Sequence, residues 1–142
     1  SKVTGMVNVV VRDEITGAIK QEFTVPNLVV DTGLAYIAGR MKDTSDAAMS
    51  HMAVGTDNTA AAAGNTALGS QLDIQALTST TVTANSVAYV ATYAAGTATG
   101  ALTEAGIFNA ASSGTMLCRT VFAVINKGAA DSMTVTWTVT IS

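Results

Sequence analysis

The sequence is poor in charged and aromatic residues and holds single copies of several residues that carry chemistry. Of its 142 residues, 12% are charged and 5% are aromatic, and Cys, His, Pro and Trp occur once each. A freely diffusing domain normally keeps a mixed, charged surface, with about a quarter of its residues charged. The single Cys118 excludes an internal disulfide and fits a reducing compartment.

These scarcities exclude most catalytic chemistry. One His and one Cys cannot form a His–Cys zinc cluster. No Gly-x-Ser-x-Gly segment offers a serine nucleophile to His51, and no Gly-x-x-x-x-Gly-Lys phosphate loop is present. Cys118 lies in an apolar segment and is expected to be an inert core thiol. The sequence therefore predicts a protein that is not an enzyme, with no catalytic residue, metal ligand or cofactor.

The charge and hydropathy patterns also exclude two classes of partner. The formal net charge is −3, with no dense basic patch, which predicts no nucleic-acid binding. No apolar run approaches the ~18 residues of a membrane span, and no signal peptide is expected at the N-terminus. The length fits one domain over residues 1–142.

The few charges are unevenly spread along the chain. Between Ala47 and Cys118 the only charged residues are Asp57, Asp73 and Glu104. Either Thr, Ser and Asn alone keep this region soluble, or neighbouring subunits cover much of its surface. We favour a covered surface formed mainly by the middle of the chain, above all by the loop 57–69. Its proposed assembly contacts are Asp57, Asn58, Thr59, Asn65, Thr66 and Leu68.

Both ends of the chain predict β-strands. Residues 132–142 alternate without a fault between apolar and Ser or Thr side chains, with Trp137 as the main core aromatic. A similar alternation over residues 3–11 leads to a hairpin turn at 13–17, where Gly17 supplies a positive φ. The return strand, 18–25, is expected to end at Pro26, which cannot donate a hydrogen bond to a sheet.

The middle of the chain predicts one short α-helix and further strands. The helix is expected over about residues 32–42, with Asp31-Thr32-Gly33 as its cap. Strands are expected at 49–55, 72–77, 80–94, 102–108 and 116–124, the last as a central strand because both of its faces are apolar. About eight strands with frequent turns predict a mainly β fold, an antiparallel β-sandwich or jelly-roll-like barrel.

Glu104 is an isolated acid within an apolar strand. It is either exposed, or buried with a basic partner, because a buried unpaired carboxylate is unstable. The candidate partners are Arg119, Arg40 or a residue of a second subunit.

Several segments resemble virion proteins of tailed bacteriophages. They are residues 28–36, Met52-Ala53-Val54-Gly55-Thr56 with Asn65-Thr66-Ala67-Leu68-Gly69, Leu102 to Asn109, and the stretch from Ile125-Asn126-Lys127 to Trp137-Thr138-Val139. The resemblance spans most of the chain. It is to small structural proteins that occur as capsid decoration (cement) proteins and in tail or fibre modules. We favour a decoration protein because fibre modules usually belong to longer chains with repetitive shafts, and this sequence has no such shaft.

For a decoration protein, the resemblance implies a symmetric homo-oligomer, with a trimer favoured, that binds the major capsid protein on the outside of the head. It would be assembled in the cytoplasm of a host bacterium. A tail, baseplate or fibre component is the second interpretation. A carbohydrate-binding module is the third, although such modules need exposed aromatic residues.

Overall fold

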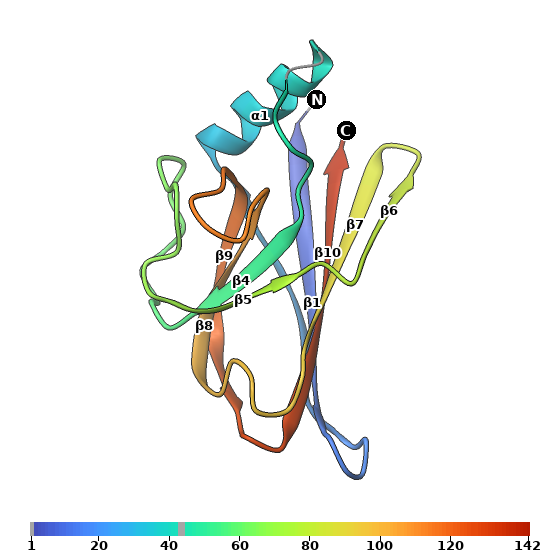
Figure 1. Ribbon diagram of the computed structural model, residues 1–142, viewed down its shortest axis with the longest axis vertical. Coiled ribbons are helices and arrows are strands. Elements are labelled where there is room, and N and C mark those ends of the chain that lie inside the picture. The colour runs from blue at the N-terminus through green and yellow to red at the C-terminus, as the bar shows by residue number, and fades with distance from the viewer. Residues whose placement is uncertain (1, 43–44) are drawn as a thin grey trace.

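The faultless alternation at the C-terminus forms the centre of a five-stranded sheet. The computed structural model describes residues 2–42 and 45–142, which form two antiparallel sheets and one helix (Figure 1). Sheet A has the strand order β2-β1-β10-β7-β6, and sheet B has the order β3-β9-β8-β4-β5. The elements are β1 Val3–Asp13, β2 Ile19–Pro26, β3 Leu28–Val29, α1 Asp31–Met41, β4 His51–Gly55, β5 Gln71–Ala76, β6 Ser79–Thr83, β7 Ser86–Tyr93, β8 Gly100–Phe108, β9 Met116–Lys127 and β10 Asp131–Ile141.

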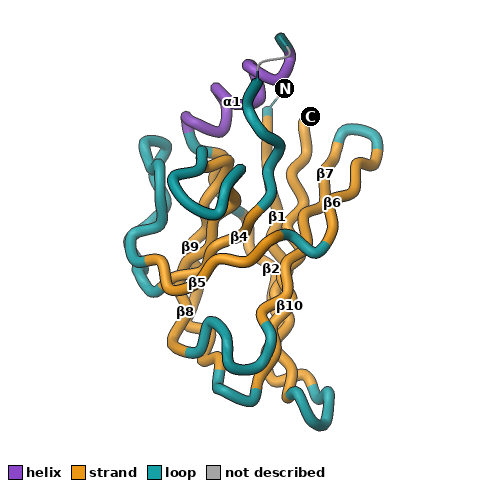
Figure 2. The backbone as a smooth tube through the Cα atoms, viewed as in Figure 1, coloured by secondary structure: helices purple, strands orange, loops and turns teal. Residues whose placement is uncertain are grey.

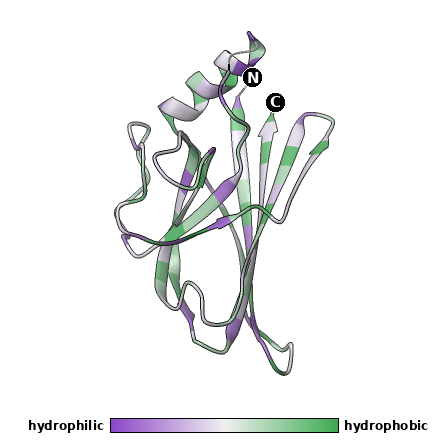
Figure 3. Ribbon diagram, in the orientation of Figure 1, coloured by the Kyte–Doolittle hydropathy of each residue, from purple (hydrophilic) through white to green (hydrophobic). Residues whose placement is uncertain are grey.

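The predicted mainly β sandwich with one short helix is confirmed. Strands and loops dominate the chain, and α1 lies across one end of the sandwich (Figure 2). Strand β10 pairs with β1 along its whole length, from Asp131 opposite Asp13 to Ile141 opposite Val3. Apolar and polar bands alternate along these strands (Figure 3), so one face of sheet A enters the core and the other faces outward.

The N-terminal hairpin also follows the sequence. Gly17 has a φ of 72°, and the Asp13 carboxylate accepts hydrogen bonds from the N–H groups of Ile15 and Thr16. Strand β2 ends at Pro26, where the chain crosses to sheet B through Asn27. The N–H of Asn27 still donates to the Gly5 carbonyl of β1, which keeps the crossing chain against sheet A.

Two predicted strands differ from the structure. The single strand expected over 80–94 is a hairpin, β6–β7, whose turn places Ala84 at a φ of 52°. Because such a φ normally favours Gly or Asn, an alanine gave no turn signal, and the described residues form ten strands rather than about eight. The strand expected to be central, β9, is second from an edge. Helix α1 contacts only the beginning of β9, where Gly33 lies against the Leu117 backbone.

The predicted cap of the helix is wrong. Helix α1 begins at Asp31, and the preceding residue, Val30, provides no side-chain cap. Asp31 lies in the first turn, where a negative charge complements the helix dipole. The Thr32 hydroxyl instead donates to the Met116 carbonyl, which ties the helix to β9.

The core lies between the two sheets and is built mainly from Val, Leu, Ile and Met. Trp137 and Tyr93 are its fully buried aromatic side chains, each 0% exposed. The Tyr93 hydroxyl of sheet A donates to the Met52 carbonyl of sheet B at 2.6 Å. The two sheets are therefore joined by a buried hydrogen bond as well as by apolar packing.

Buried charges close the end of the sandwich opposite α1. The Lys127 ammonium donates to the carbonyls of Ala94, Thr97 and Asp131. The Asp131 carboxylate accepts from the Lys20 ammonium at 2.9 Å and from the Gly128 N–H. Burial lowers the pKa of Lys127, whereas the hydrogen bond from Lys20 is the largest of the effects that lower the pKa of Asp131. This cluster ties β2, the loop after β7 and the β9–β10 turn together.

Replacing Trp137 with Ala should lower the free energy of unfolding by about 3–5 kcal/mol, because a large buried side chain leaves a cavity. Trp137→Phe should lower it less, since it keeps most of the ring volume and removes an indole N–H that has no hydrogen-bond partner. Chemical denaturation measures both variants. A loss below about 1 kcal/mol for Trp137→Ala would contradict its place in the core.

Asp131 should make the fold sensitive to acid. Its pKa is held below the ordinary value of 3.8, so the unfolded chain binds this proton more readily than the folded chain. The stability that Asp131 contributes is therefore complete above pH 3.8 and is lost as the pH falls through the folded-state pKa. Denaturation over a pH series should show a weaker acid dependence for Asp131→Asn than for the wild type. Parallel pH profiles would disprove this role.

Candidate assembly site

A long loop covers the outer face of sheet B. Residues 56–70, here called the crossing loop, connect the neighbouring strands β4 and β5 but extend across β8 to β9 (Figure 1). One apolar side chain of the loop, Leu68, is only 9% exposed. It belongs to a small second core, separate from the main one, whose other buried members are Val30, Ala53, Phe108 and Met116.

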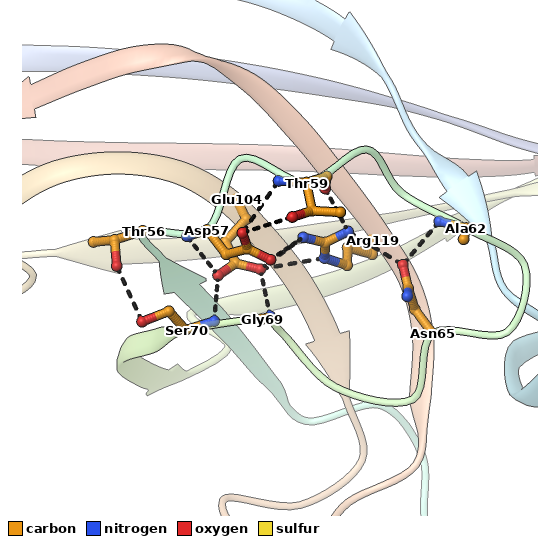
Figure 4. Close-up of polar contacts among 9 residues, drawn as sticks. All are labelled: Thr56, Asp57, Thr59, Ala62, Asn65, Gly69, Ser70, Glu104 and Arg119. Atoms are coloured by element: carbon orange, nitrogen blue, oxygen red, sulfur yellow. Dashed lines mark hydrogen bonds and ion pairs between the residues drawn. The ribbon is translucent and has the colours of Figure 1, made fainter.

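Glu104 of β8 holds both ends of the crossing loop. Its side chain is 0% exposed and accepts hydrogen bonds from three backbone N–H groups (Figure 4). The donors are Asp57 at 3.0 Å, at the start of the loop, and Gly69 and Ser70 at 2.8 and 2.7 Å, at its end. Hydrogen bonds to an ionised acceptor are about twice as strong as neutral ones. One carboxylate therefore fixes two loop segments that are far apart in sequence.

Arg119 of β9 completes this arrangement. Its Nε and Nη2 donate to Glu104 Oε1 at 3.2 and 3.0 Å, and its side chain is 2% exposed. Its Nη1 donates to the Thr59 carbonyl and to Asn65 Oδ1, both at 3.1 Å. The planar guanidinium thus binds a carboxylate on one side and the middle of the loop on the other.

Of the partners considered for Glu104, the structure shows Arg119 within the same chain. Arg40 lies elsewhere, near the end of α1, where its Nη1 donates to the Asp46 carbonyl. Arg119 thus supplies the basic partner that a buried carboxylate needs. Because the crossing loop covers the pair, Glu104 and Arg119 organise the surface from beneath and are not contact residues themselves.

Two glycines allow the close approach on which this packing depends. A methyl group at Gly55 would collide with the Ser70 carbonyl and with the Glu104 carboxylate. At Gly69 a methyl group would collide with the Asp57 carboxylate. Any larger residue at either position would push the loop away from sheet B.

Asp57 caps the first turn of the loop. Its Oδ1 accepts from the N–H and hydroxyl of Thr59, and these hydrogen bonds, helped by the charge of Arg119, hold the pKa of Asp57 below its ordinary value. The Arg119 Nη2 lies 3.5 Å from its Oδ2. Asp57 is thus an ionised turn residue at neutral pH rather than a proton donor.

The six proposed contacts divide into three groups. Asn58, Thr59 and Thr66 are exposed. Asp57 and Asn65 are half-buried and point partly toward Arg119. The prediction for Leu68 is wrong, because this side chain packs inward in the second core and is inaccessible to a neighbour. An apolar residue in an isolated polar loop gives no periodicity from which its direction could be predicted.

Shallow grooves flank the crossing loop. One, of about 440 Å³, lies between the end of the loop and the turn after β8 and is lined mainly by Ala, Ser, Thr and Gly. Another, of about 360 Å³, lies between the start of the loop and the segment 26–28, where Arg119 is the one charged lining residue. Such surfaces suit close packing against another protein more than recognition of a charged ligand.

A second uncharged surface lies on the outer face of sheet A. Cross-strand partners line up in three successive rows across the sheet. The surface that these rows form is here called the threonine face. The rows are Ser79-Val90-Thr136-Asn8-Thr24, Thr81-Ala88-Thr138-Met6-Pro26 and Thr83-Ser86-Thr140-Thr4. Sequence reasoning predicted the Thr-lined side of β10 but missed this face, because only strand order shows that the rows join.

Two further residues that could carry chemistry, Cys118 and His51, lie in strands of sheet B. Cys118 is 0% exposed, and burial raises the pKa of its thiol, so it is not an activated nucleophile. His51 lies in β4 and shares a 2.8 Å hydrogen bond with the Ser50 hydroxyl. No group of three or more His, Cys, Asp or Glu side chains that could hold a metal ion occurs within residues 2–42 and 45–142.

Comparison with protein-family models, with curated proteins and with solved structures finds no match for this chain. In the part of the chain that the structure describes, no helix has the length and hydropathy to cross a membrane. The function is therefore inferred from the chemistry of the chain's own surface.

Glu104→Gln should lower the free energy of unfolding by about 3–5 kcal/mol, because it leaves the Arg119 cation buried without a counter-ion. The matched control is Asp57→Asn, which removes a carboxylate whose side chain is 30% exposed from the same guanidinium. The control should lose much less stability. Chemical denaturation followed by Trp137 fluorescence measures both variants. Equal losses would show that the buried Glu104–Arg119 pair contributes no more to stability than the half-exposed contact of Asp57.

Proposed function

We propose that the protein is a non-enzymatic structural subunit of a tailed-phage virion, a capsid decoration protein that binds the major capsid protein and stabilises the head. The observation that carries this proposal is the threonine face, which crosses five strands in three rows without a charged residue. The segments that resemble virion proteins are the reason for proposing a phage virion as the assembly to which this surface binds.

The threonine face has properties of a contact surface. Eight of its fourteen side chains are the β-branched Thr or Val and three more are Ser or Ala, so most of the face loses little conformational entropy when it is immobilised. Some are already fixed, since the Ser86 and Thr140 hydroxyls share a 2.8 Å hydrogen bond and the Asn8 amide donates to the Thr24 hydroxyl. Because this surface carries no charge, it does not repel a charged partner. Specific binding to it therefore depends on the complementary shape of the partner.

The size of this face favours a symmetric assembly over a single strong contact. With about 3.3 Å per residue along a strand and about 4.8 Å between strands, its fourteen positions span about 450 Å². This is about half of the ~800 Å² that each partner contributes to a standard interface. A homo-oligomer, with a trimer favoured by the resemblance, would multiply such contacts over the capsid.

The crossing loop supports the same role. Its exposed residues Asn58, Thr59 and Thr66 are neutral, and the buried ion pair beneath them fixes the backbone. A rigid loop loses less entropy on docking than a mobile one. The loop therefore offers a second, preorganised contact surface on the opposite sheet.

The carbohydrate-binding interpretation has less support. Such modules present exposed aromatic rings to sugars, but every aromatic side chain here is buried or half-buried. Five are buried, and Phe23 and Tyr36 are half-buried. The described residues therefore offer no aromatic platform to a sugar ring.

Labelled antibody against the purified protein should mark the head of the virion in electron micrographs. Particles that lack the protein should assemble but release their DNA at a lower temperature. Label found only on the tail would overturn the capsid assignment in favour of a tail, baseplate or fibre role, and label on neither part would disprove a virion role.

A matched pair of variants tests the surface itself. Thr138→Lys places a charge in the middle of the threonine face and should weaken binding to undecorated particles at least tenfold. Ile15→Lys, in the exposed turn between β1 and β2 and away from both the threonine face and the crossing loop, should bind as the wild type does. Equal binding by both variants would exclude the threonine face as the capsid contact.

A further inference from the structure

Strand β6 is an open edge of sheet A. It consists of Ser79–Thr83 and pairs on one side only, with β7 (Figure 1). All five residues are exposed, and Val82 is 70% exposed. Alternate N–H and C=O groups of such a strand point away from the sheet without a partner, which makes it a template for a further strand.

The other three edges of the two sheets are protected. Strand β2 carries Lys20, Glu22 and Pro26, and its Gln21 side chain donates to the Val124 carbonyl of β9. Strand β3 has only two residues. Strand β5 contains Asp73, and its pairing with β4 is interrupted by a bulge. Charge, proline, short length and bulges are the usual means by which proteins block pairing at sheet edges.

Strand β6 has none of these means of protection. Its sequence, Ser-Thr-Thr-Val-Thr, is uncharged and contains four β-branched residues, which favour extended structure. Its register with β7 is regular from Ser79 to Thr83. A chain that protects three edges and leaves the fourth one flat, neutral and strongly β-forming has an edge suited to pairing.

We propose that β6 pairs antiparallel with β6 of a second copy of this chain, so that two sheets A join into one continuous ten-stranded sheet. The occupant follows from the charge pattern. In a two-fold contact the same strand supplies both sides, so a net charge on β6 would be repeated on its partner and would repel it. The uncharged β6 avoids this repulsion, whereas an edge that binds a strand of a different protein can carry charge, because the partner can carry the opposite charge.

The strand is also self-complementary in register. With the two-fold axis at Thr81, this residue faces its own copy, Ser79 faces Thr83, and Thr80 faces Val82. Cross-strand Thr–Thr pairs are favourable in antiparallel sheets. Ser79, Thr81 and Thr83 belong to the threonine face, so pairing would join two such faces into one neutral surface. This contact is independent of the proposed virion role, and it gives a two-fold dimer instead of the trimer that the resemblance favours.

Sedimentation equilibrium tests the pairing directly. The wild type should reach twice the 14.3 kDa chain mass, with a Kd that Thr81→Lys raises at least tenfold, because two lysines then face each other at the axis. The control is Thr134→Lys, an exposed position on the same side of sheet A but on the inner strand β10, which should dimerise as the wild type does. Circular dichroism should show that both variants are folded.

Cross-linking tests the register. In antiparallel pairs, Cβ atoms of facing residues are about 4.5–5.5 Å apart, close to the ~3.5–4.5 Å that a disulfide needs. Thr81→Cys should therefore form a disulfide-linked dimer under mild oxidation, and Thr134→Cys should not. The native Cys118 is buried and does not compete.

The outcomes separate the alternatives. A wild type that stays monomeric at every concentration would overturn the proposal and would leave the edge to a strand of another protein. A mass of three chains without a Thr81→Cys cross-link would also overturn it, and would indicate a head-to-tail contact. A dimer that Thr81→Lys does not weaken would place the interface elsewhere.

Discussion

The buried pair of Glu104 and Arg119 determines the shape of one half of the molecule. The crossing loop is long, polar and rich in alanine, and one inward side chain, Leu68, is too little apolar surface to order it. The carboxylate supplies the missing constraint by binding N–H groups at both ends of the loop, and the guanidinium binds its middle. We therefore expect that loss of this pair would release the loop and uncover the outer face of sheet B with its small second core.

The same pair illustrates an unusual distribution of charge. Four charged residues, Glu104, Arg119, Lys127 and Asp131, are each no more than 2% exposed. In a chain with few charges to begin with, this leaves the surface even more neutral than the composition suggests. Buried ion pairs add less to stability than their Coulomb attraction suggests, because desolvation opposes it. Their effect here is specificity: they select one path for the loops and leave the outer faces free for packing.

Local pattern predicted the fold better than the site. The strand around Trp137 was predictable because its period-two alternation can be recognised from neighbouring residues. The turn at Gly17 was predictable because glycine readily adopts a positive φ. The turn at Ala84 was not, because alanine carries no turn signal. The direction of Leu68 was also unpredictable, since it depends on a surface formed by distant strands. A buried Glu104 with a basic partner was one of two predictions from the sequence, and the choice of this alternative and of Arg119 required the register of β8 with β9.

The two ends of the chain lie side by side at one end of sheet A, beside α1 (Figure 1). The backbones of Lys2 and Ser142 exchange hydrogen bonds of 2.6 and 2.8 Å, because β1 and β10 are antiparallel neighbours. Tension applied to both ends would therefore open this ladder one hydrogen bond at a time, as a zip opens, rather than shear all of its bonds together. A sandwich connected in this way is mechanically weak when pulled by its termini. The faces and edges of its sheets are therefore better placed than the termini to pass a load to adjoining molecules.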